Sequence, residues 1–153
     1  MAVSWTAYRG EEYWQWEDTK QWCEGIALAH PEWVTLHDIG RSVEDEPIYL
    51  LTIGRNDGRQ NDRPGLWLDG GTHASEWTGV MSAIYSVCRW VEALVRGDAS
   101  ELAYFEAHTV YVVPCISPDG FAATMKGHPF MRSSKRPPPS DEYLVGLEAR
   151  DLD

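Results

Sequence analysis

Cysteine is scarce in this sequence, and what there is forms no recognisable pattern. Among 153 residues there are three, Cys23, Cys88 and Cys115, and no two of them stand in a Cys-x-x-Cys pair. An odd number without paired spacing argues against a disulfide framework and against a thiolate zinc site. Unpaired thiols are typical of reducing compartments, and the N-terminal residues show neither the basic start nor the apolar run of a signal peptide. We therefore expect a cytoplasmic protein.

Positive charge and long apolar runs are also in short supply. Thirteen Lys and Arg residues stand against 24 Asp and Glu, which gives a formal net charge of −11. Such an acidic chain is poorly suited to bind the phosphate backbone of nucleic acids or an anionic membrane, and we expect neither partner. No stretch approaches the roughly 18 apolar residues of a membrane span. With 43% hydrophobic residues and eight Trp, the composition is that of one globular domain.

Strand-like and helix-like patterns alternate along most of the chain. The clearest begins at Trp77, where apolar residues recur with the three-and-four spacing of one helix face for about five turns. Further helices are expected over 12–29 and from 98 or 100 to 105, and strands over 33–40, 47–54, 64–71 and 108–117. Strands that alternate with long helices predict an α/β fold, with a mixed, largely parallel sheet flanked by helices.

The last part of the sequence lacks a sustained period. "SPDG" at 117–120 has the composition of a turn. Over 127–153, a triple proline and the absence of any repeat predict an irregular, proline-rich surface excursion. Nothing after Ser117 adds an element to the sheet, and the ending "EARDLD" closes neither a helix nor a strand. We therefore expect residues 1–153 to be a chain cut short, which forms only part of a single domain.

A histidine and a glutamate follow a double glycine in "LWLDGGTHASEW", residues 66–77. In open α/β sheets, ligands bind beyond the carboxyl ends of the strands, and this segment leaves such an end. The spacing places His73 and Glu76 on the same side of a first helical turn, close enough to share one zinc ion. The two glycines allow a sharp turn with room for an ion. Asp69 is a candidate partner for the second imidazole nitrogen.

The same residues also fit roles that involve no metal. Thr72 or Ser75 could cap the following helix, and Glu76 could simply favour the positive end of the helix dipole. Catalytic zinc sites typically use three protein ligands, and this motif supplies two. None of the remaining histidines is a convincing third ligand; they are His30, His37, His108 and His128.

Three segments follow one another in a family-like order and spacing. They are "GRSVEDEPI" within 30–54, "DGGTHASEW" within 63–77 and "SPDGFAATMKGHPFMR" within 111–136. Together they resemble the zinc carboxypeptidases of the M14 (carboxypeptidase A-like) family over nearly the whole chain. The resemblance implies a peptide substrate, with His73 and Glu76 as two of three zinc ligands. It also implies that Arg132 polarises the scissile carbonyl and stabilises the oxyanion, a role that suits a permanently charged guanidinium.

Some positions depart from the family pattern. Ser75 stands where many members carry an arginine, which removes one substrate-side cation, and Asp45-Glu46 replaces the usual Gly-Arg. The family's third zinc ligand, its Asn-Arg pair, its Tyr and its general-base Glu have no counterpart in this chain. The resemblance thus implies that residues 1–153 are the N-terminal portion of a single M14-like domain. It implies zinc-dependent hydrolysis of C-terminal peptide bonds by the complete domain, and little or no activity in this chain alone. The alternatives are a zinc-dependent deacylase of N-acyl amino acids and a non-catalytic binding module of the same fold.

Overall fold

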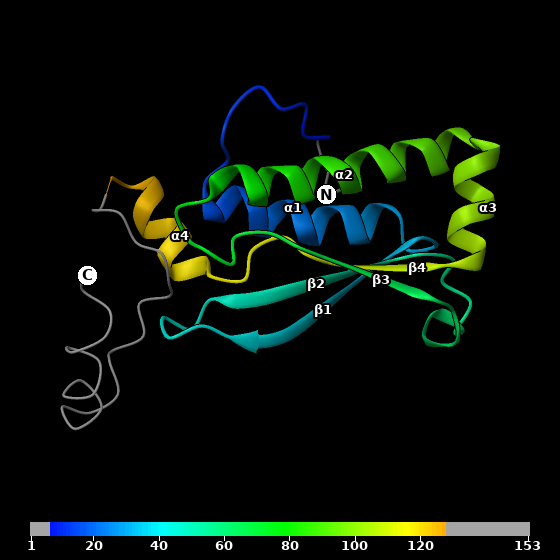
Figure 1. Ribbon diagram of the computed structural model, residues 1–153, viewed down its shortest axis with the longest axis horizontal. Helices are drawn as coiled ribbons and strands as arrows, with labels where there is room; N and C mark the ends of the chain where they lie inside the picture. The colour runs from blue at the N-terminus through cyan, green and yellow to red at the C-terminus, as the bar shows by residue number, and fades with distance from the viewer. Residues whose placement is uncertain (1–6, 128–153) are drawn as a thin grey trace, which may run out of the picture.

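Helices lie along one face of a mixed sheet in the computed structural model, which describes residues 7–127 (Figure 1). Its strands are β1 (Val34–Arg41), β2 (Pro47–Ile53), β3 (Gly65–Asp69) and β4 (Thr109–Val113). Its helices are α1 (Trp16–Ala29), α2 (Trp77–Arg96), α3 (Ala99–Ala107) and α4 (Pro118–Met125), and a short 3-10 helix spans Gln60–Asp62. Within the part of the chain that the structure describes, no helix has both the length and the apolar character needed to cross a bilayer.

The sheet has the strand order β1-β2-β4-β3, and the prediction of a mixed α/β sheet with helices packed on it is confirmed. Its parallel share is smaller than predicted, because among the described strands only β3 and β4 run parallel. The pairs β1–β2 and β2–β4 are antiparallel. For β1 and β2 the physical reason lies in the connection over 42–46, which is too short for the crossover that a parallel pair requires and therefore makes a hairpin.

The core is formed where α1 and α2 cover the sheet. Alternate residues of the two central strands point toward these helices, and all are fully buried: Leu51, Ile53, Val110 and Val112. The apolar face predicted for α2 meets them and is equally buried at Val80, Ile84, Val87 and Val91. Burial of each such side chain stabilises the fold by roughly 1.5–3 kcal/mol. The start of α2, where the candidate ligands lie, is therefore attached to a rigid layer.

A helix follows β4 where the sequence had suggested a turn. The prediction for "SPDG" was wrong, because α4 begins at Pro118 and continues to Met125. Serine, proline and aspartate are as common at helix N-termini as in turns, so their composition did not distinguish the two. Phe121 is fully buried and anchors the new helix in the core. The excursion predicted for 127–153 lies, beyond Gly127, outside the described residues.

The turn between β1 and β2 is fastened to α4. The buried carboxylate of Asp119, at 1% exposure, accepts hydrogen bonds from the hydroxyl of Ser42 (2.5 Å) and from the backbone N–H of Glu44 (3.2 Å). Asp45, which stands at a usual glycine of the family pattern, has a φ of 64°. Figure 1 shows this turn, α4 and the start of α2 gathered at one end of the sheet. The candidate ligands lie at that same end.

Candidate metal site

The loop between β3 and α2 begins with two glycines, and both are required by their surroundings. A Cβ on Gly70 would lie 2.6 Å from the carbonyl oxygen of Pro114 and 2.7 Å from that of Gly79. Gly71 has a φ of +61°, and a Cβ there would lie 3.0 Å from the sulfur of Cys115. The double glycine therefore lets the chain pass between the end of β4 and the first turn of α2, in addition to turning sharply as predicted.

The loop brings His73 and Glu76 together. The imidazole Nδ1 lies 3.0 Å from the carboxylate Oε1, and the backbone N–H of Glu76 donates to the carbonyl of His73 over 3.0 Å. The two side chains are 39% and 57% exposed. They share one side of a turn that precedes α2, since the helix itself begins at Trp77. The turn achieves the proximity that we expected from a first helical turn.

The donor set and its spacing fit a zinc ion. Two ligand atoms at 2.0–2.1 Å from zinc, separated by a tetrahedral angle, lie about 3.3 Å apart. The observed 3.0 Å between the imidazole nitrogen and the carboxylate oxygen is close to that value, and it is also the length of the direct hydrogen bond that joins the two groups. In the described part of the chain, no group of three His, Cys, Asp or Glu residues could hold a metal ion. The described residues therefore supply two donors, and a catalytic site needs at least one more.

Helix capping does not account for the loop residues. No side-chain hydrogen bond caps α2, whose preceding residue is Glu76. The hydroxyl of Thr72 donates to Asp69 Oδ1 over 2.9 Å. The other carboxylate oxygen of Asp69 accepts a 2.7 Å hydrogen bond from the indole of Trp67. Thr72 and Asp69 thus tie the end of β3 to the loop. The carboxylate of Asp69, which we had suggested as a partner for the imidazole of His73, accepts hydrogen bonds from Thr72 and Trp67.

The other sequence candidates lie apart from this loop or outside the described residues. His37 is exposed on β1, and His30 ends α1. His108 precedes β4 at the end of that strand far from the loop, with Nδ1 3.1 Å from the carbonyl of Tyr104. His128 and Arg132 lie outside the described residues.

The cysteines are excluded as donors by their surroundings. Cys23, Cys88 and Cys115 are all buried and none forms a disulfide. Burial raises the pKa of Cys88 to about 11 and that of Cys115 to about 12. Because the thiolate is the form that binds metal and reacts as a nucleophile, these protonated thiols serve the core rather than a site.

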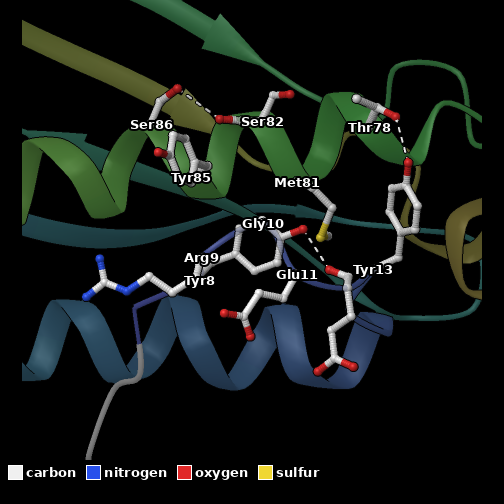
Figure 2. Close-up of a pocket in the computed structure, with 11 residues that line it drawn as sticks. Tyr8, Arg9, Gly10, Glu11, Tyr13, Thr78, Met81, Ser82, Tyr85 and Ser86 are labelled. Atoms are coloured by element: carbon white, nitrogen blue, oxygen red, sulfur yellow. Dashed lines mark hydrogen bonds between the residues drawn. The ribbon is translucent and has the colours of Figure 1, made fainter.

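A hollow of about 520 Å³ lies beside the start of α2, between this helix and the N-terminal segment (Figure 2). Tyr13 lines it and shares a 3.1 Å hydrogen bond between its hydroxyl and that of Thr78. The ring of Tyr13 also packs edge-on against Trp77, with centroids 5.8 Å apart. His73 and Glu76 do not line this hollow. The N-terminal segment therefore braces α2 just after His73 and Glu76, through Tyr13.

Sequence reasoning missed the residues that hold the loop backbone. The segment after β4 runs beside the loop, where Ile116 N–H donates to the carbonyl of Gly70 over 3.0 Å. Ser117 donates twice over 3.1 Å, from its N–H to the carbonyl of Gly71 and from its hydroxyl to that of Thr72. No local sequence pattern predicts these contacts. The loop is therefore held as an extension of the β3–β4 pairing.

Comparison with known proteins agrees with this arrangement. The sequence model of the family described as "Zinc carboxypeptidase" (Peptidase M14) matches residues 19–152. Carboxypeptidase B of Astacus astacus is 28% identical over 133 residues, which cover 87% of this chain and 40% of the relative. Zinc carboxypeptidase A 1 of Drosophila melanogaster is 30% identical over 134 residues, which cover 86% of this chain and 30% of the relative. The chain thus spans well under half the length of these curated relatives.

Solved structures share the fold. Bovine thrombin-activatable fibrinolysis inhibitor, in complex with tick carboxypeptidase inhibitor, superposes with a TM-score of 0.70 at 23% identity, over 83% of this chain and 38% of that one. Carboxypeptidase A from Helicoverpa armigera gives a TM-score of 0.70 at 19% identity, over 87% of this chain and 31% of that one. Since the family model covers most of the sequence, the chain belongs to the M14 zinc carboxypeptidase family.

Proposed function

We propose that this chain is the N-terminal part of the catalytic domain of a zinc metallocarboxypeptidase, which removes residues from the C-terminal end of peptides. The observation that carries the proposal is the 3.0 Å approach of His73 Nδ1 to Glu76 Oε1, at the carboxyl end of β3. Membership of the zinc carboxypeptidase family supports the choice of metal and of reaction. His73 and Glu76 are accordingly two of the protein ligands to the zinc ion.

Each residue has a definite part in this proposal. Zinc in such a site supplies Lewis-acid polarisation of a carbonyl and an activated water. His73 contributes a neutral imidazole and Glu76 an anionic carboxylate, which together hold the ion at the rim of the sheet. Arg132 donates hydrogen bonds to the oxygen that gains negative charge, because its guanidinium stays protonated. In this proposal the third ligand and the general base are not among residues 1–153, so we do not expect the chain to catalyse the reaction alone.

Zinc titration of the chain tests the metal site. We expect His73→Ala and Glu76→Ala each to weaken zinc binding by about tenfold or more, because one of only two donors is lost. His37→Ala is the matched control, since His37 is an exposed histidine on β1 away from the loop. The zinc affinity of the His37→Ala variant should equal that of the unmodified chain. Zinc binding that survives both His73→Ala and Glu76→Ala unchanged would overturn the proposal.

A test of the substrate class requires a protein that contains the complete catalytic domain. Blocked dipeptides with a free C-terminus should lose their C-terminal residue, and removal of zinc by a chelator should abolish this activity. Release of an acyl group from N-acyl amino acids, with the dipeptides left intact, would instead indicate a deacylase. An extended protein that binds zinc but cleaves neither class would be a binding module of the same fold.

A further inference from the structure

A single buried hydroxyl lies behind the ligand pair. Thr124 is on α4, and its side chain is buried, with 6% of the residue exposed. The indole N–H of Trp77 donates to Thr124 Oγ1 over 2.9 Å. The same Oγ1 lies 3.2 Å from the carbonyl oxygen of Ala74 and 3.0 Å from that of Phe121, and its single proton is shared between these two acceptors. Thr124 thus connects α4 to two points of the segment that carries His73 and Glu76, namely Ala74 and Trp77.

The positions of these partners give the contact its importance. Ala74 directly follows His73 and is fully buried. Trp77 directly follows Glu76 and begins α2. One hydroxyl therefore holds the backbone just after the first donor and the side chain just after the second. Figure 1 shows α4 beside the start of α2, as these hydrogen bonds require.

The ligand side chains depend on their backbone for position. His73 and Glu76 are 39% and 57% exposed, so part of each side chain lies against solvent. The 3.0 Å approach of their donor atoms depends on the turn between them, in which Glu76 N–H donates to the carbonyl of His73. Groups that orient metal ligands without touching the ion typically change metal affinity by 10- to 100-fold when removed. A buried group bonded inside this turn is placed to have that effect.

We propose that Thr124 is a positioning residue for the metal site, acting through the carbonyl of Ala74 and the indole of Trp77. The inference rests on the proposed zinc site and adds to it a residue that does not touch the ion. The hydroxyl fixes the peptide between the two donors, so that the imidazole and the carboxylate are already close before zinc binds.

Zinc titration of the 153-residue chain, followed by the histidine ring signals in ¹⁵N NMR, tests this role. Thr124→Val keeps the shape of the side chain and removes its hydrogen bonds, and we expect zinc affinity to fall about tenfold. Thr124→Ser keeps the hydroxyl and should restore affinity to within about threefold of the unmodified chain. Thr109→Val is the matched control, because Thr109 is equally buried and its hydroxyl donates to Gln60, at the opposite end of β4.

Urea unfolding of every variant separates positioning from general destabilisation. Three results together would support the role. Zinc affinity should fall tenfold in Thr124→Val, return close to that of the unmodified chain in Thr124→Ser, and stay unchanged in Thr109→Val despite the lower stability of that variant. Unchanged affinity in a folded Thr124→Val, or an equal loss in Thr109→Val, would overturn the role. Should the valine variant not fold, a tenfold loss in Thr124→Ser would overturn it as well, and retained affinity would support it. If the histidine signal that responds to zinc persists in His73→Ala, the zinc site itself has failed, which is a separate result.

Discussion

Replacement of Gly70 by alanine should destabilise the protein through a clash that no side chain can relieve. The new Cβ would lie 2.6 Å from the carbonyl oxygen of Pro114, 2.7 Å from that of Gly79 and 2.9 Å from the carbonyl carbon of Gly79. All three are main-chain atoms, so α2 or the end of β4 must shift. Overpacking of this kind costs about 1–3 kcal/mol, and three simultaneous backbone contacts place Gly70→Ala near the upper end, at about 3 kcal/mol.

The assay is urea unfolding followed by tryptophan fluorescence, with thermal unfolding in parallel. A loss of about 3 kcal/mol corresponds to a fall in Tm of roughly 6–12 °C for a chain of this size. The matched control is Gly79→Ala, at the other side of the same contact. Its Cβ would meet nothing closer than 3.6 Å, and alanine gains about 1 kcal/mol over glycine inside a helix. Gly79→Ala should therefore be neutral or stabilising. A Gly70→Ala variant as stable as the unmodified protein would refute the reasoning.

Three further changes test the turn between β1 and β2. Asp45→Gly should raise the free energy of unfolding by up to about 1 kcal/mol in urea titrations, since glycine adopts a φ of 64° without strain. Asp119→Ala should lower it by about 3 kcal/mol, because two donors of the turn lose a buried acceptor; an unchanged Tm would contradict this. Burial raises the pKa of Glu46, but hydrogen bonds from Lys20 and Trp16 outweigh it and hold the pKa below the ordinary 4.5. This stabilisation is full above pH 4.5 and is lost as the pH falls through the lowered pKa, so unfolding at pH 3 and pH 6 should differ less in Glu46→Gln.

Sequence periodicity predicted the elements whose burial is one-sided. The apolar spacing of α2 was readable because one face of the helix meets the sheet along its whole length, as the burial of Val80, Ile84 and Val91 shows. The direction of strand pairing has no such signature within a strand, and it was inferred from the alternation of strands with long helices. Residues 117–120 were misread because Ser-Pro-Asp-Gly suits a turn and a helix start alike.

The candidate ligands His73 and Glu76 could be located from sequence, whereas the residues that hold their loop could not. His73 and Glu76 are three residues apart, and a turn of almost any kind brings side chains at that spacing together. Ser117 and Thr124 hold the same loop from positions 45 and 50 residues further along the chain. Serine and threonine are common surface residues, and nothing in their neighbours reveals a distant carbonyl as the partner. Such roles emerge only when the topology of the sheet is known.

The parallel pairing of β3 with β4 has a consequence for how the chain folds. These strands are neighbours in the sheet, yet the whole of α2 and α3 separates them in sequence. Such a crossover closes a long loop before it gains any contacts, whereas the β1–β2 hairpin closes through a few residues. We therefore expect the contacts of Ile116 and Ser117 that hold the loop after β3 to form late in refolding, after the hairpin. Zinc added to the unfolded chain would meet His73 and Glu76 on a loop that these contacts do not yet hold.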